Sequence, residues 1–176
     1  MIQIKNAAEL QKMRKACAIS AAALKAGGEA IEPGITTAEI DKIIYDFIVR
    51  HGARPNFLHL YGFPATACIS VNDTVIHGIP NKQQQIRPGD IVSIDTGCKI
   101  DGFNGDNACT YACGKIDLEA QRLLDVTKES LHRGIEMACG GNRVGDIGHA
   151  VQSYVEENSF SVVRTFVGHG VGKELH

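Results

Sequence analysis

Two stretches near the N-terminus carry apolar residues at helical spacing. The first helix is predicted from a capping box at Asn6 to the glycine pair at residues 27–28, and the second from a capping box at Thr36 to Gly52. The second helix has an unbroken apolar stripe: Ile40, Ile43, Ile44, Phe47 and Ile48. A stripe of this kind has to pack against a sheet or a core.

Strand-forming residues occupy the middle of the chain. Residues 66–71 are predicted to form a strand and residues 74–77 a short return strand after a turn. Residues 91–94 and 109–111 are rich in strand formers on either side of Asp101-Gly102, a pair that closes two-residue hairpins. We therefore expect an antiparallel hairpin here.

Helical spacing returns after the hairpin. A long helix is predicted from Asp117 to residues 140–141, and a shorter one over residues 145–157. Residues 160–167 are predicted to form a further strand. The order of helix, helix and strand therefore occurs twice along the chain.

The two helix–helix regions also match each other residue by residue. Residues 34–52 and 141–159 agree in glycine, acidic and apolar positions at a constant offset of 107. Two amphipathic helices could agree by chance, but the matching order of elements favours one α/β unit written twice. We expect a single domain with a first half over residues 1–115 and a second half over 116–176. The counterpart of the hairpin would fall beyond residue 176, so the second half is expected to be incomplete.

The predicted hairpin brings two acids together. If residues 101 and 102 form its loop, Gly97 faces Asp106 and Asp95 faces Ala108, so the two aspartates are diagonal neighbours on one face. Like charges on a half-buried face are unfavourable unless one is protonated or a cation lies between them. The pair therefore requires a proton or a metal ion.

Composition limits the classes of partner. With 176 residues, 44% of them hydrophobic, the chain is long enough for one globular domain. A net charge of -2 and the lack of long Lys/Arg runs argue against direct binding to nucleic acid. No secretory signal pattern or membrane-length apolar run occurs, so the cytoplasm is the expected location. The six cysteines have no metal-binding or disulfide spacing and are expected to be reduced.

Two histidines stand in settings that suit a site. His169 lies between two glycines, and with the acid pair it would form a mixed oxygen and nitrogen ligand set suited to Mn, Fe, Co, Ni or Zn. A lone histidine in such a loop is more often structural. His77 precedes a Gly-Ile-Pro turn, where it could cap a strand or, beside a metal, donate a proton or a hydrogen bond to a substrate.

Three segments together resemble the type I methionine aminopeptidases: CISVNDTVIHGIPN, RPGDIVSIDTGCKIDGFNGD and FVGHGVGKELH. The resemblance implies a pita-bread α/β fold of two pseudo-symmetric halves. It also implies metal-dependent removal of the initiator methionine when the second residue is small. The substrates would be nascent chains with N-terminal methionine. The protein would act on them in the cytoplasm near the ribosome, as a monomer and without a membrane partner.

The resemblance implies two divalent metal ions, drawn from Co, Mn, Fe, Ni or Zn. Asp95 would bind one metal in bidentate fashion, Asp106 would bridge both metals and His169 would bind the second. The family's two glutamate ligands lie in its second half, and the only carboxylate side chain after His169 is Glu174, which no motif marks as a ligand. The chain would therefore supply part of the ligand set.

The resemblance also assigns residues to the substrate. His77 and His176 would contact it and stabilise the tetrahedral species, while Cys68 and Phe63 would line the methionine pocket. Residues 57–63 depart from the family's glycine- and tyrosine-rich version of this wall.

Two other functions are compatible with parts of the sequence. A related enzyme for Xaa-Pro peptides shares the fold, but the HGIP and GHGVG contexts favour methionine. The alternative from a different class is a pita-bread module that has lost catalysis and binds peptides or proteins. Retention of the repulsive acid pair and of His169 argues against that loss.

Overall fold

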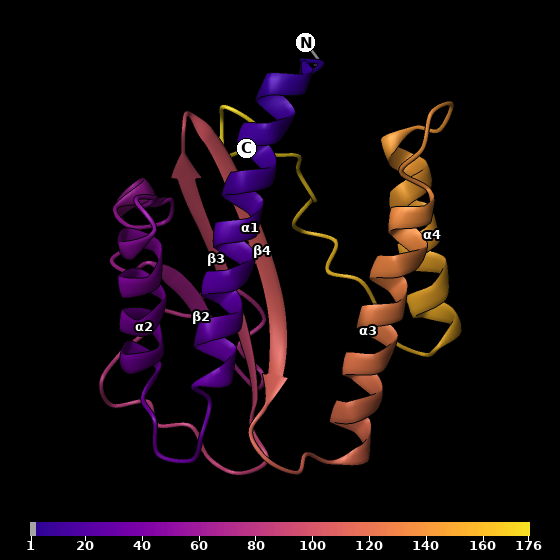
Figure 1. Ribbon diagram of the computed structural model, residues 1–176. Coiled ribbons are helices and arrows are strands. Elements are labelled where there is room, and N and C mark those ends of the chain that lie inside the picture. The colour runs from indigo at the N-terminus through magenta and orange to yellow at the C-terminus, as the bar shows by residue number, and fades with distance from the viewer. Residues whose placement is uncertain (1–2) are drawn as a thin grey trace. The chain divides into compact units, whose positions relative to one another are not determined.

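The structure, a computed structural model, describes residues 3–176, and these form two units (Figure 1). The first unit extends to Ile116 and also includes His169–His176, while the second is Asp117–Gly168. The candidate site residues singled out by the sequence all belong to the first unit. None of the helices within residues 3–176 is long and apolar enough to cross a membrane.

The first unit is an antiparallel sheet of four strands, β1 (Arg54–Pro55), β2 (Ala67–Val71), β3 (Ile91–Ile100) and β4 (Phe103–Ala112). Strand β3 is central because it pairs with β1 and β2 along one edge and with β4 along the other. A short 3-10 helix, η1 (Leu60–Gly62), lies between β1 and β2.

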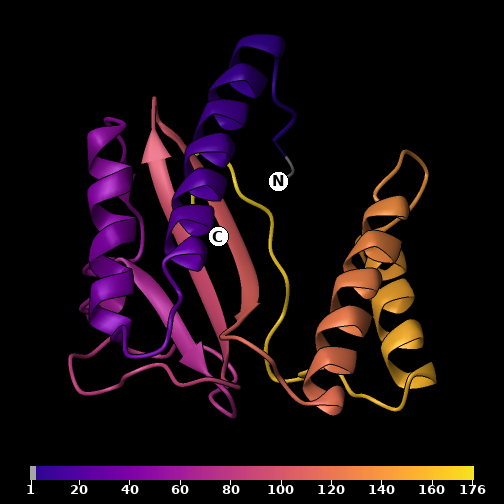
Figure 2. The same ribbon diagram turned by 60° about the horizontal axis from the view of Figure 1, so that its bottom comes forward.

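Two helices cover one face of this sheet, α1 (Ala7–Glu29) and α2 (Thr37–Arg50) (Figure 2). Both predicted capping boxes are confirmed, since the side chains of Asn6 and Thr36 accept from the third backbone N–H of each helix. The glutamate at that position returns the hydrogen bond in each case, so N–H groups of the first turn are satisfied.

The hydrophobic core lies between these helices and the sheet. The predicted stripe of α2 is confirmed, with Ile40, Ile44 and Ile48 fully buried. Strand residues on the helix-facing side complete the core: Ile69, Val92, Ile94 and Cys98. This packing covers the helix-facing side of β3, the strand that carries Asp95.

The hairpin has the predicted register. Gly97 lies opposite Asp106, and Asp95 opposite Ala108. Asp101 and Gly102 have φ angles of 52° and 83°, as a type I′ turn requires at both central positions. The turn dipeptide therefore sets which face of the hairpin each later side chain occupies.

The prediction that α1 stops at its glycine pair is wrong, because the helix continues to Glu29. A Cβ atom on Gly27 would lie 2.7 Å from Ile44 Cδ1, and one on Gly28 would lie 2.1 Å from the Tyr111 ring. The glycines thus permit close packing of α1 on α2 and β4 rather than ending the helix.

Two predicted strands are also absent from residues 3–176. In residues 74–77 the Thr74 N–H turns back to the Val71 carbonyl at 3.2 Å, and His77 has a φ of 57°, which is left-handed rather than extended. Residues 160–167 pair with no strand of the described chain. Strand-forming residues make a strand only where a neighbouring edge accepts their hydrogen bonds.

The second unit contains a pair of helices, α3 (Leu118–Glu136) and α4 (Val144–Glu157), which pack on each other. Asp117 caps α3 by accepting from the Ala120 N–H at 2.7 Å. The bounds of α4 are those of α2 moved by 107 residues at both ends, as the sequence repeat predicts.

Candidate metal and substrate site

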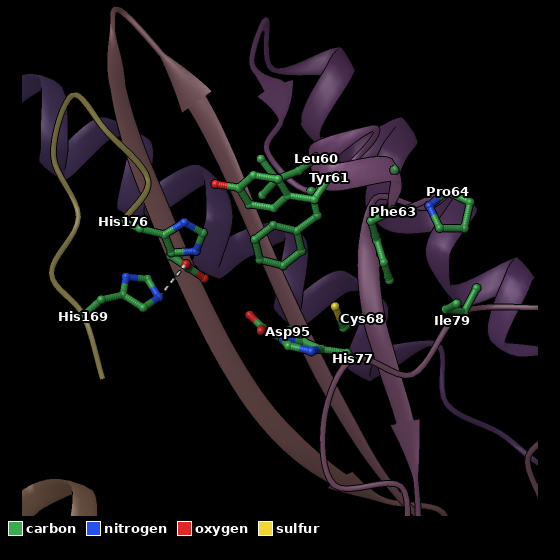
Figure 3. A pocket seen from close by; sticks show the side chains of 13 residues that line it. Leu60, Tyr61, Phe63, Pro64, Cys68, His77, Ile79, Asp95, His169 and His176 are labelled. Atoms are coloured by element: carbon green, nitrogen blue, oxygen red, sulfur yellow. Dashed lines mark ion pairs between the residues drawn. The ribbon is translucent and has the colours of Figure 1, made fainter. Parts of the chain in front are cut away.

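A pocket of about 560 Å³ opens on the face of the sheet away from the helices (Figure 3). It brings together every site residue that the sequence suggested: Phe63, Cys68, His77, Asp95, Asp106, His169 and His176. The pocket is also lined by other residues of the expected wall segment 57–63, and by two residues outside it, Pro64 and Ile79.

The two aspartates meet within the pocket. Cys98 faces α1, since its thiol contacts the Ala16 carbonyl at 3.5 Å, so Asp95 three residues earlier points to the opposite face of β3. Burial raises the pKa of Asp95 to about 7, and the charge of Asp106 and a hydrogen bond donated to Asp106 add to the increase. Burial also raises the pKa of Asp106, although His169 opposes this. The pair is therefore short of positive charge.

Two imidazoles reach the acids from the C-terminal segment. His169 Nε2 lies 4.0 Å from Asp106 Oδ2, the contact drawn as a dashed line in Figure 3. The rings of His169 and His176 stand edge to face with centroids 4.7 Å apart. Residues distant in the chain thus place two nitrogen donors beside the carboxyl pair.

A tight return loop brings His77 to the pocket. The Ile69 N–H donates to the Gly78 carbonyl at 2.8 Å, and the Gly78 N–H donates to Ser70 Oγ at 3.1 Å. A Cβ atom on Gly78 would lie 2.2 Å from the Ile69 carbonyl oxygen, so only glycine permits this approach. The prediction of a return strand was wrong, yet the loop still delivers His77 to the site.

Residues 57–63 form an apolar pocket wall with an unusual backbone. His59 and Tyr61 have φ angles of 69° and 50°, in the left-handed region that non-glycine residues seldom adopt. A hydrogen bond from the His59 N–H to the Phe63 carbonyl, 2.8 Å long, closes the loop. Strain of this kind tends to collect at binding sites. The family resemblance places the wall at these residues, but their departure from the family's usual residues gave no guide to this backbone.

The thiol of Cys68 belongs to the wall rather than to the chemistry. Burial, reinforced by the charge of Asp95, raises the pKa of Cys68 to about 12. A thiol with so high a pKa stays protonated and is a poor nucleophile. It therefore presents a small, polarisable apolar surface to a ligand.

The carboxyl and imidazole groups of the pocket are possible ligands of a divalent ion. Within residues 3–176, no three His, Cys, Asp or Glu side chains are grouped closely enough to hold a metal as they stand. The chemistry of the set nevertheless fits one, because two half-buried carboxyls short of positive charge lie beside an imidazole. Mixed oxygen and nitrogen donors suit first-row divalent metals.

Comparison with known proteins gives the class of the chain. Metallopeptidase family M24 matches residues 11–176, so the chain belongs to this family of metal-dependent hydrolases. A methionine aminopeptidase of Clostridium perfringens is 51% identical over 176 residues, covering the whole chain and 70% of that relative. This confirms the resemblance to the methionine aminopeptidases.

Solved structures agree with this placement. Methionine aminopeptidases from Rickettsia prowazekii and Thermotoga maritima match the chain with TM-scores of 0.97, at 39% and 40% identity. Each match covers all of this chain and 71% of the other. The predicted pita-bread fold is thereby confirmed.

Proposed function

We propose that this protein removes the N-terminal methionine from nascent chains whose second residue is small. One observation supports the proposal most strongly. Two carboxyls that lack a neutralising positive charge lie beside two imidazoles in a pocket with apolar walls. The relatives are named as methionine aminopeptidases, which supports the same reaction. A non-catalytic binding module is not favoured.

The pocket supplies the specificity in this proposal. Phe57, Phe63 and Cys68 line the same pocket as the carboxyl pair and present apolar surface to it. An unbranched thioether fills irregular apolar space well and contacts aromatic rings favourably. The methionine side chain would be held there, which places its amide carbonyl toward Asp95 and Asp106.

We propose that Asp95, Asp106 and His169 hold divalent metal, with Mn, Fe, Co, Ni and Zn as candidates and two ions as the full complement. When bound, such metal supplies Lewis acidity that polarises the scissile carbonyl and lowers the pKa of water toward about 7. Burial makes the aspartates favourable ligands, because a cation relieves the cost of keeping two carboxylates in one apolar site.

The histidines contribute hydrogen bonds and protons. His77 and His176 line the same pocket as the acids, from different parts of the chain. Donors directed at the oxygen of the scissile carbonyl stabilise charge that develops only in the transition state. His77 would also be suited to protonate the leaving amine.

The direct test is release of methionine from Met-Gly-Met by this chain, with Mn²⁺ or Co²⁺ added. We expect release with metal, none with excess chelator, and none from Ala-Gly-Met. Absence of methionine release with every candidate metal, from protein that is folded by circular dichroism and binds Mn²⁺ by calorimetry, would refute the proposal.

The cellular setting belongs to the same proposal. Initiator methionine is carried by chains still leaving the ribosome, so we place the protein in the cytoplasm as a monomer acting near ribosomes. Sedimentation equilibrium tests the monomer, since a mass of twice the 18.9 kDa chain would contradict it.

A further inference from the structure

One buried asparagine joins the strand of Asp106 to the segment of the two histidines. Asn104 precedes Asp106 by two residues in β4, so both side chains lie on the same face of the strand. Only 2% of Asn104 is exposed. Its backbone N–H donates to the Gly172 carbonyl at 2.9 Å, and its Nδ2 donates to the carbonyls of Gly172 at 2.9 Å and Lys173 at 3.1 Å.

The two carbonyls that Asn104 binds belong to residues midway along the chain between His169 and His176. His169 precedes Gly172 by three residues, and His176 follows Lys173 by three. Glycines at 168, 170 and 172 give the segment much backbone freedom. Without an anchor, the imidazole of His169 would not be held at its 4.0 Å separation from Asp106.

The other contacts of this segment are more exposed. Lys99 Nζ donates to the Lys173 carbonyl at 2.9 Å, and Lys173 Nζ pairs with Glu9 at 2.9 Å. The Lys173 side chain of that ion pair is 58% exposed, and exposed pairs contribute little. The hydrogen bonds of Asn104 are shielded from water, so they are the dominant restraint.

We infer that Asn104 is a positioning residue of the peptidase site. It holds the imidazoles of His169 and His176 opposite Asp106 by fixing the two carbonyls between them. This inference rests on the proposed function, because it assigns both imidazoles to the reaction. Misplacement of a reacting group by about 1 Å can lower a rate by roughly 10²-fold, which sets the size of the expected effect.

The test compares two changes at Asn104 with a matched control on the same strand. Asn104→Ala removes both side-chain hydrogen bonds, and Asn104→Asp removes the donors while preserving the volume. The control is Asn107→Ala, since the Nδ2 of Asn107 is buried without a hydrogen-bond partner in the described structure. Loss of an unpaired donor should leave the segment unchanged.

Three measurements separate positioning from general stability. Amide hydrogen exchange should accelerate roughly tenfold in residues 168–176 of both Asn104 variants, with α2 unchanged. Affinity for Mn²⁺, measured by calorimetry, should fall by roughly tenfold because His169 is no longer held. For Met-Gly-Met, kcat should fall by about 10²-fold while KM changes little. The control should match the wild type throughout.

Several results would overturn the inference. Unchanged exchange in residues 168–176, or equal acceleration in α2, would show that Asn104 does not act on this segment. Faster local exchange with unchanged Mn²⁺ affinity and kcat would show that it does not position the site. A wild-type chain without turnover would defeat the proposed function alone, because exchange and Mn²⁺ affinity would still decide the role of Asn104.

Discussion

The helix pairs α1–α2 and α3–α4 share one close glycine contact but differ greatly in burial. A Cβ atom on Gly27 would lie 2.7 Å from the Ile44 side chain, and one on Gly134 would lie 2.8 Å from that of Val151. Gly134 and Val151 are the counterparts of Gly27 and Ile44 at the offset of 107. In both halves, a glycine at the equivalent position allows the two helices to approach closely.

The surroundings of the two pairs differ. Ile44 is fully buried under the sheet, whereas Val151 is only half-buried. On α3, Leu131 and Ile135 are each 58% exposed, and the described residues of this unit include no strand. A helix pattern therefore determines which face is apolar, but a sheet is required to bury that face.

The largest expected effect is on catalytic activity, which should depend on an aspartate of the first unit and not on one of the second. Asp106→Asn removes a carboxylate from the site, and kcat/KM for Met-Gly-Met should fall by roughly 10³-fold, equivalent to about 4 kcal/mol of transition-state stabilisation. The matched change Asp146→Asn, at the start of α4, should leave turnover near the wild-type value. Similar losses in both variants would mean that activity follows stability rather than the site.

The next effect tests the difference in burial. Ile44→Ala should lower the free energy of unfolding by about 3 kcal/mol, because it leaves a cavity in a closed core. Val151→Ala should cost only about 1 kcal/mol, since water reaches much of that side chain. Urea unfolding followed by circular dichroism measures both, and equal costs would contradict the comparison.

A smaller effect tests the glycine contacts. Gly27→Ala forces a methyl group against a buried isoleucine and should destabilise the protein by about 2 kcal/mol. Gly134→Ala meets Val151, which can move toward solvent, and about 1 kcal/mol is expected. Amide exchange in α2 and α4 reports each pair separately. A larger effect at Gly134 would show that the second pair is the more tightly packed.

The smallest effect concerns the second residue after the end of α2 and of α4. Gly52 and Ser159 are counterparts, with φ angles of 71° and 63°, and only glycine adopts this conformation without strain. Ser159→Gly should therefore stabilise α4 by about 0.5 kcal/mol, and Gly52→Ser should destabilise the first unit by a similar amount. Amide exchange in α4 should be slower in Ser159→Gly than in the wild type. Faster exchange would contradict the prediction.

Much of the fold could be read from local chemistry. The Asp101-Gly102 turn set the hairpin register, and hence the side of the sheet that Asp95 and Asp106 share. Capping boxes located the starts of α1 and α2. These features involve residues close in the chain, so their physics is complete without knowledge of distant partners.

The sequence by itself determined the helix periods, the hairpin register, the internal repeat and the family motifs. Only the tertiary structure showed that Gly27 and Gly28 serve packing, and that residues 160–167 pair with no strand of the described chain. It also determined the backbone of the pocket wall and the hydrogen bond from Asn104 to the segment that carries His169. The reason is that close approach, strand pairing and anchoring depend on surfaces supplied by residues far away in the chain.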